Sequence, residues 1–504
     1  MPPRIAGALP LLIPLDSRAA QPLHEQIYSA LRQSILGGRL KPGTRLPSSR
    51  ALAAELEVAR NTVLDAFERL SAEGYIEGRA GGGTRVALTL PEEALRARRA
   101  RPRRAVTHHR RSSHRASITS TIGTLRVRQW SGPLSDVQPF RLGALALSHF
   151  PMELWSTLMR RRWRQMNPAS IDYGEIAGYR PLRESIAAYL RSARGVSCEA
   201  AQVLIVNGSQ QGLDLASRIV LDPGDSAWIE EPGYDGARGA LVASSARSVP
   251  VPVDAEGLNV QAGIQRCSTA RMVFVTPSHQ FPLGVTMSLP RRLELLRWAQ
   301  SAGAWIFEDD YDSEFRYSTR PLPALQGLDT AGSVIYAGTF SKVLYPSLRI
   351  GYLVVPPTLI DAFIRLRLLV DVHPPTFMQA VLADFIDEGH FERHLRRMRI
   401  LYRERQEALV RAVRRNLGGM LEIAPSEGGM HVVAWLPRGV DDNDAAAAAV
   451  AAGLNVTALS FFAQTRLRRG ALLLGYAGFT PERIASGTQR LARALEPLLR
   501  PVTK

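Results

Sequence analysis

A series of short apolar runs constrains the fold of this chain more than any other feature. Beyond Gly123, strand-like runs alternate with helical patterns, and the runs occupy residues 203–206, 272–275, 304–307, 334–336 and 351–355. This alternation is typical of an α/β domain with a mostly parallel sheet. A polar or glycine-bearing turn follows each run. Since ligands bind at the carboxyl ends of parallel strands, we expect these turns to converge on one site.

Two of these turns carry groups that suit a phosphate and a charged ring. After the first run, Ser209 and Gln210 open a helix whose free amides and hydroxyl suit a phosphate. After the third run come two adjacent carboxylates, Asp309 and Asp310. Buried carboxylates need a cationic partner, and a protonated pyridine nitrogen is one. The pattern leaves open which of the two carboxylates points inward.

Lys342, in the turn after the fourth run, has the sharpest chemical implication. The chain holds 63 Lys and Arg residues, but its lysines are Lys41, Lys342 and Lys504 alone. A lysine retained in an arginine-biased chain indicates chemistry that arginine cannot perform, above all the loss of a proton to give a nucleophilic amine. Thr339 precedes it, and Arg349 can fork onto a phosphate. This turn therefore predicts a Schiff base between Lys342 and pyridoxal 5′-phosphate.

The N-terminal part of the chain has the pattern of three helices and a hairpin. Apolar residues spaced by four predict a first helix over about residues 21–37. Ser48 or Ser49 can cap a short second helix, and a third begins near Arg60. Residues 74–86 carry the pattern of a glycine-tipped hairpin. Together these elements predict a winged helix-turn-helix.

The third helix and the charge distribution both point to DNA. Arg60, Asn61 and Thr62 form the exposed first turn of this helix, the part of such a motif that meets base edges in the major groove. Residues 1–115 carry 20 Lys and Arg against 10 Asp and Glu, which is +10 of the total +17. A basic excess at one end is typical of a nucleic-acid binder. A general bias toward arginine is the alternative explanation of this excess.

Signatures in this N-terminal part resemble the GntR superfamily. The stretches P-G-T-R-L-P-S-S-R at 42–50, R-N-T-V at 60–63 and E-G-Y-I at 73–76 carry the resemblance. It implies that the protein binds a double-stranded DNA operator. The contacts that it implies are Arg50, Arg60 and Thr62, with backbone contacts from Arg45 and the wing tip at 81–83, including Gly82.

The longer part of the chain resembles a fold-type I aminotransferase, and the whole chain resembles the MocR/GabR group of transcription regulators. The motifs that carry the resemblance are G-Y-R-P-L-R at 178–183, E-E-P-G-Y at 230–234, T-P-S-H-Q-F-P-L-G at 276–284, E-D-D-Y-D-S-E-F at 308–315 and G-T-F-S-K at 338–342. The resemblance implies a multidomain fold. An α+β winged helix would precede an α/β pyridoxal-phosphate transferase domain of fold type I with a smaller C-terminal α+β subdomain.

The resemblance also assigns roles around the cofactor. Lys342 would form the Schiff base, and Asp309 would pair with the pyridine nitrogen, with Asp310 as the alternative. Tyr311 would donate a hydrogen bond to the phenolic oxygen, and Tyr234 would stack on the ring. The implied phosphate contacts are Ser209, Gln210, Thr339 and Arg349.

Two positions depart from the pattern of working aminotransferases. Phe281 stands where such enzymes usually present the asparagine of an Asn-Pro-x-Gly motif. Leu473 stands where they carry an arginine for the substrate carboxylate. Arg466, Arg468 and Arg469 lie just upstream and are alternative carboxylate ligands, but a solvated loop is the favoured interpretation of this stretch. We therefore expect no sustained turnover, with residual aminotransferase activity as the open alternative.

These departures favour a sensor over an enzyme. We expect a DNA-binding transcription regulator that senses an amine or amino-acid-like effector, or pyridoxal phosphate itself. One alternative is an active aminotransferase that carries a DNA-binding domain, and another is a regulator whose large domain has lost its cofactor. The resemblance further implies that the protein is a homodimer. We expect the protein to be located in the bacterial cytoplasm, associated with DNA.

The chain divides into three expected segments. These are a winged-helix domain at 1–88, a basic linker at 89–125 and a cofactor domain at 126–504 with a small subdomain from about 385. The linker loses apolar periodicity, as a solvated tether does, and its arginines either contact phosphates or only keep it extended. Two cysteines provide neither a disulfide framework nor a zinc site. No run approaches the roughly 18 apolar residues of a membrane span.

Overall fold

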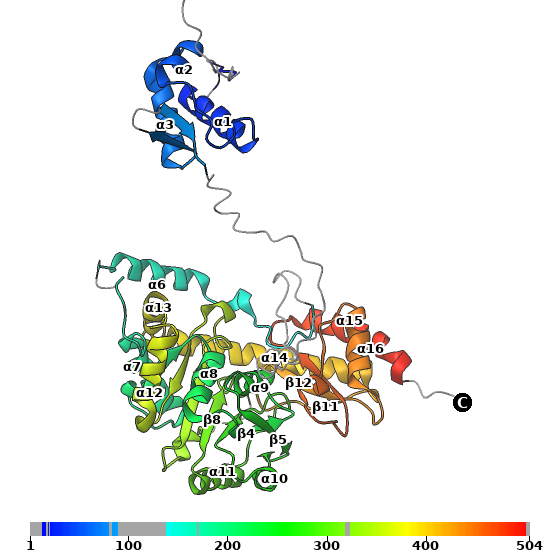
Figure 1. Cartoon of the computed structure of the whole chain (residues 1–504). Coiled ribbons are helices and arrows are strands. Elements are labelled where there is room, and N and C mark those ends of the chain that lie inside the picture. Colours follow the sequence, from blue (N-terminus) through cyan, green and yellow to red (C-terminus); the bar gives the residue numbers. More distant parts are fainter. Residues whose placement is uncertain are drawn as a thin grey trace, which may run out of the picture. The chain divides into compact units, whose positions relative to one another are not determined.

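A computed structural model describes residues 13–16, 19, 21–79, 83–88, 138–168, 171–317 and 323–499. They form two compact units, which comprise residues 1–111 and 112–504 and are considered separately below (Figure 1). The expected DNA contact at Gly82 and the expected linker at 89–125 lie outside the described residues.

The first unit contains the three helices and the hairpin that the sequence predicts. Its elements are α1 (Leu23–Leu36), α2 (Ser49–Glu55), α3 (Arg60–Ala72), β1 (Ile76–Arg79) and β2 (Gly83–Val86). Ser48 caps α2 by accepting a hydrogen bond from the amide of Ala51 at 3.2 Å. The apolar residues spaced by four lie on one face of α1, where Ile27 and Leu31 pack against Val63 of α3 in the core.

The second unit is built on an eight-stranded sheet with the order β3-β10-β9-β8-β7-β4-β5-β6. Its strands are β3 (Val203–Val206), β4 (Ser226–Glu231), β5 (Arg247–Asp254), β6 (Gly257–Leu258), β7 (Met272–Val275), β8 (Trp305–Asp310), β9 (Val334–Thr339) and β10 (Gly351–Val354). The strands from β9 to β5 are parallel, whereas β10 runs antiparallel to both of its neighbours. The carboxyl ends of β4, β7, β8 and β9 therefore share one edge.

Helices cover both faces of this sheet, which explains why β3, β7 and β10 are buried along their whole length, whereas β4 and β8 become acidic at their carboxyl ends. The helices of the unit are α6 (Met152–Arg164), α7 (Arg180–Arg194), α8 (Ser209–Val220), α9 (Asp235–Ala243), α10 (Val260–Arg266), α11 (Leu289–Ala302), α12 (Ile360–Val370), α13 (Thr376–Asp387), α14 (His390–Leu417), α15 (Asp442–Ala451) and α16 (Pro481–Leu499). Phe274 and Phe307 pack with α8 and α9 on one face, and Val273 and Ile306 pack with α11 on the other.

A second, smaller sheet lies toward the C-terminus. It has the antiparallel order β11-β12-β14-β13 and consists of β11 (Glu422–Ile423), β12 (His431–Trp435), β13 (Thr457–Ala458) and β14 (Ala471–Gly475). The long helix α14 packs against α13 near the large sheet and against β11 and α16 beside the small one (Figure 1). This arrangement is the α/β domain with a smaller α+β subdomain that the sequence predicts.

β8 and β9 each extend three residues beyond the predicted runs, to Asp310 and Thr339, so side chains that were expected in turns belong to the sheet. The acidic stretch after residue 307 was expected to be a turn, but β8 continues through Asp310 because residues 306–310 pair with 334–338 of β9. The sequence pattern also missed β4, β5 and β6. None of the helices in the described ranges combines the length and the hydropathy that a membrane span requires.

Candidate functional site

The predicted cofactor residues converge at one edge of the large sheet. Thr339 is the last residue of β9, and Lys342 follows three residues later. Asp309 lies near the end of β8, and Ser209 is the first residue of α8. The antiparallel strand β10 brings its beginning to this edge, because Gly351 pairs with Thr339 and with Val206. It is therefore the segment before β10, and not the turn after it, that reaches the site.

The start of α8 and the segment before β10 form a cradle with the character of an anion site. Gly208 precedes the helix with φ 95°, and the Arg349 Nη2 donates to the carbonyl of Asn207 at 2.6 Å. A Cβ atom at Gly208 would lie 3.0 Å from Arg349 Nη2. The first amides of a 12-residue helix thus lie beside a guanidinium group. The close approach is possible because residue 208 has no side chain.

Tyr234 and Gln210 are connected beside this cradle. The Tyr234 hydroxyl donates to Gln210 Oε1 at 3.0 Å, and Gln210 Nε2 donates to the carbonyl of Gly236 at 3.0 Å. The Tyr234 ring lies 6.2 Å from the Phe281 ring in an edge-on orientation. These contacts fix the orientation of an aromatic face near the start of α8.

The pleat of β8 separates the two adjacent carboxylates. Asp310 points toward α7, where its Oδ2 accepts from Arg194 Nε at 2.9 Å and from the Tyr336 hydroxyl at 2.6 Å. Asp309 lies on the other face, which it shares with Phe307 and α8. One oxygen of each carboxylate, Oδ1, is buried without a hydrogen-bond partner among the described residues.

The electrostatic surroundings distinguish Asp309 further. Burial raises the pKa of Asp309 to about 8, the negative charges of Asp310 and Asp312 raise it as well, and the positive charge of Lys342 lowers it. A carboxylate of this kind is stable as an anion only beside a cation. The orphaned Oδ1 of Asp309 and the cradle at Gly208 therefore fit a ligand that brings a protonated ring nitrogen and a phosphate.

The sequence did not single out a buried network behind Tyr311. His279 Nδ1 lies 3.0 Å from the Tyr311 hydroxyl and 3.0 Å from Asp312 Oδ2, and its Nε2 lies 3.4 Å from Ser426 Oγ. His279 and Asp312 are almost fully buried. Both residues stand within quoted motifs, so the signal was present, but only the tertiary structure shows that they meet at Tyr311.

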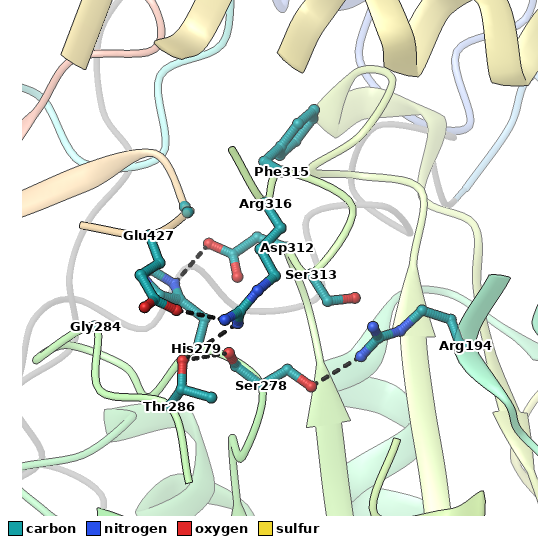
Figure 2. A pocket seen from close by; sticks show the side chains of 12 residues that line it. Arg194, Ser278, His279, Gly284, Thr286, Asp312, Ser313, Phe315, Arg316 and Glu427 are labelled. Atoms are coloured by element: carbon teal, nitrogen blue, oxygen red, sulfur yellow. Dashed lines mark hydrogen bonds and ion pairs between the residues drawn. The ribbon is translucent and has the colours of Figure 1, made fainter. Parts of the chain in front are cut away.

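A small pocket beside this network is held open by charged side chains (Figure 2). Arg316 is paired with Glu427 and donates from Nη1 to Thr286 Oγ1 at 3.3 Å, and Arg194 Nη2 donates to Ser278 Oγ at 2.8 Å. His279 and Asp312 point toward each other at its wall. Lys342 and Asp309 do not line this pocket. The pocket therefore borders His279 and Asp312 and does not include the cradle residues Gly208 and Arg349.

In the first unit, four of the predicted DNA-contacting residues are exposed, namely Arg45, Arg50, Arg60 and Asn61. Thr62 is partly exposed. Arg60 Nε donates to Ser49 Oγ at 3.4 Å, so the first residues of α2 and α3 are close together.

Arg45 is exposed beside the hairpin. It forms an isolated antiparallel bridge with Arg85, and a Cβ atom at Gly83 would lie 3.2 Å from Arg45 Nε. The Arg45 side chain therefore lies against Gly83, at the tip end of the hairpin. The hairpin and the segment before α2 form one continuous surface.

Two family models match the chain, one on each unit. The model described as bacterial regulatory proteins of the gntR family matches residues 23–86. The model of aminotransferase class I and II matches residues 143–491, which is more than half of the chain. The fold and the site thus define a helix-turn-helix regulator joined to a domain of aminotransferase type.

Similar proteins share this combination along their whole length. The chain is 42% identical over 484 residues to "Probable rhizopine catabolism regulatory protein MocR" of Rhizobium meliloti and covers 96% of each chain. It is 34% identical over 501 residues to the HTH-type transcriptional regulator TauR of Rhodobacter capsulatus, with 96% of this chain and all of that one covered. The chain belongs to the MocR-type transcription regulators of the GntR family.

Solved structures agree for the larger unit. The α-aminoadipate aminotransferase LysN of Thermus thermophilus, complexed with a phosphopyridoxyl-leucine compound, is 30% identical with a TM-score of 0.69, over 75% of this chain and 97% of that one. The cofactor of the larger unit is therefore pyridoxal phosphate, which its residues fit. The expectation of a domain without a cofactor is not supported.

Proposed function

We propose that this transcription regulator binds a small primary amine at its pyridoxal phosphate and responds by changing how its winged helices engage DNA. The observation that carries the proposal is the placement of Lys342 and the orphaned Asp309 carboxylate beside an anion cradle, in a chain that also carries a helix-turn-helix. When bound, pyridoxal phosphate supplies an aldehyde carbon that forms a Schiff base with one amine and can exchange it for another.

The chain's own residues hold the cofactor and govern Lys342. In this proposal Arg349, Thr339, Ser209 and Gln210 bind the phosphate at the cradle. Tyr234 covers the ring, and Asp309 is the partner of the ring nitrogen because Asp310 already pairs with Arg194. Lys342 would hold the cofactor covalently, and the bound cofactor would supply an aldehyde carbon open to exchange between this amine and the amine of an effector.

In this proposal, a hydrogen bond with His279 orients the hydroxyl of Tyr311. Burial raises the pKa of its hydroxyl, so it stays protonated and can donate toward the phenolic oxygen of the cofactor. His279 and Asp312 are positioning residues, because they act through Tyr311. Their hydrogen bonds keep the hydroxyl at one place in the site.

On the DNA side, we propose that Arg60, Asn61 and Thr62 read bases, since they form the first turn of α3. Arg50 and Arg45 supply phosphate contacts from the segments beside that turn. The wing tip at Gly82 belongs to the same proposed interface. An effector can change DNA affinity only if it binds the two conformations of the protein with different affinity.

We also propose a homodimer, since paired half-sites require two winged helices. Large apolar side chains stand exposed on and around α6 and α12, where Trp163 is 68%, Tyr173 82% and Leu369 83% exposed. Trp163 lies beside Phe377 and Tyr173 beside His373, both of which follow α12, and exposed apolar side chains that gather in this way are typical of interaction sites. We further propose that the chain divides into a winged-helix domain at 1–88, a linker at 89–125 and a cofactor domain at 126–504. We place the protein in the bacterial cytoplasm.

The test compares sensing with turnover in the full-length, cofactor-loaded protein. Amines and a keto acid are added while the visible absorption of the lysine-bound cofactor is followed. A stable spectral shift without consumption of the keto acid supports the sensor. Sustained cycling that depends on the keto acid would show the alternative, an active aminotransferase with a DNA-binding domain.

A further inference from the structure

Leu473 and Phe281, the two departures from the enzyme pattern, belong to one apolar cluster. Leu473 is fully buried at the centre of β14, between Val433 of β12 and Thr457 of β13. The pleat points its neighbours in the strand into the main core and points Leu473 to the other face. The fully buried members of this second cluster, here called the apolar wall, are Leu142, Leu459, Phe462, Ala471 and Leu473, and Phe281 packs against them.

Phe281 connects the apolar wall with the cofactor residues. Its ring lies 4.9 Å from the ring of Phe462 in an edge-on orientation. On its other sides it lies 6.2 Å from Tyr234 and 6.1 Å from Tyr311. A molecule held at Lys342 beneath Tyr234, as proposed above, would therefore meet the apolar wall at Phe281, where an enzyme of this fold would present a polar ligand to a carboxylate.

The arginines nearest in the sequence do not repair this loss. Arg469 donates from Nε to the carbonyl of Leu436 at 2.6 Å and from Nη1 to Glu422 at 2.6 Å. Arg466 and Arg468 are exposed. The Glu231 carboxylate accepts hydrogen bonds from the amides of Gln464 and Thr465, just after Phe462. An acidic side chain therefore lies beside the apolar wall. A carboxylate against the apolar wall would lose its hydration without gaining a cation from these three arginines.

We infer that the effector is a primary amine without an α-carboxylate, whose carbon skeleton packs against the apolar wall. This inference rests on the proposed amine sensing and adds the chemical class of the ligand. Phe281, Phe462 and Leu473 are its specificity-determining residues. Burying a methylene group against such a wall lowers the free energy of binding, whereas burying a carboxylate in the same place raises it.

The test uses pairs of ligands that differ only in the α-carboxylate, namely 2-phenylethylamine with L-phenylalanine and isopentylamine with L-leucine. The full-length, cofactor-loaded protein is titrated, and the change in visible absorption gives the half-saturating concentration. We expect each amine to act at a concentration at least about tenfold lower than its amino acid. An amino acid that acts at an equal or lower concentration overturns this inference and leaves amine sensing intact. If neither ligand changes the spectrum, both proposals fail.

Variants locate the preference in the apolar wall. Leu473→Arg is expected to shift the preference toward the amino acids, whereas Leu473→Met, which keeps the volume and adds no charge, keeps it. Phe281→Asn is the second test, because the Arg substitution at a fully buried position can prevent folding. The Phe281→Asn variant is expected to bring the half-saturating concentrations of the amine and of its amino acid closer together in each pair. An unchanged ratio in a folded Phe281→Asn protein, as judged by retained cofactor binding, contradicts the assignment.

Discussion

At the scale of single residues, the ionisation of Asp309 is the property most open to measurement. Burial raises the pKa of this carboxyl from its ordinary value of 3.8 to about 8, although the positive charge of Lys342 acts in the opposite direction. A raised pKa stabilises the folded protein at low pH, and this contribution is lost as the pH rises through about 8. The same burial makes Asp309 a suitable partner for a protonated ring nitrogen.

We therefore predict that cofactor-free protein loses thermal stability as the pH rises from about 4 to about 8, and that Asp309→Asn loses less. Part of the slope remains in the variant, because burial also raises the pKa of Glu230, Glu308 and Glu314 to about 7 each. The melting temperature across this range is the measurement. Asp361→Asn, at an exposed position of α12, is the control and is expected to follow the wild type. Equal slopes in all three proteins would refute the assignment.

At the scale of elements, the turn before α8 shows how backbone geometry makes the cradle. Gly208 combines a φ of 95° with a close approach to Arg349. Gly208→Ala adds backbone strain of about 1–3 kcal/mol and a crowded methyl group, so we predict cofactor affinity at least roughly tenfold lower. Gly239→Ala in α9 is the matched control, because nothing lies within 4 Å of its added Cβ. Fluorescence titration of the cofactor-free proteins would show the difference, and equal affinities would disprove the cradle.

The start of α3 is the element on which DNA recognition depends in this account. Arg60→Ala is expected to weaken operator binding by about 1–3 kcal/mol if the side chain reads a base. Arg218→Ala removes the same charge from a partly exposed position on α8 and is expected to have no such effect. Binding curves on one operator fragment at a fixed salt concentration provide the comparison. Equal losses in the two variants would indicate a general effect of charge.

Element by element, the sequence predicted what local pattern determines. The helices of the first unit follow from residues such as Ile27 and Leu31 at helical spacing, and Lys342 stood out because lysine is rare in this chain. The choice between Asp309 and Asp310 stayed open, because it depends on how far β8 pairs with β9 and hence on contacts distant in sequence. The network of His279 with Asp312 was missed for the same reason.

At the scale of the whole molecule, the exposed apolar side chains near α12 predict self-association. We expect the wild type to be a dimer at micromolar concentration and Leu369→Glu to shift it toward the monomer, because a charge in an interface loses hydration. Leu289→Glu, at a position 57% exposed on α11, is the control and should remain dimeric. Light scattering distinguishes these outcomes. A monomeric wild type would remove the dimer from the account.

The central claim is that an amine bound in the larger unit changes DNA binding by the smaller one, and operator affinity tests it most directly. The dissociation constant of the full-length, cofactor-loaded protein is measured on the intergenic fragment beside its own gene, with and without 2-phenylethylamine. We predict a change of about 5-fold to 150-fold, typical of coupling between two sites. The same amine should have no effect on Lys342→Ala. An affinity that the amine leaves unchanged in the wild type, although the cofactor spectrum shifts, would contradict the account.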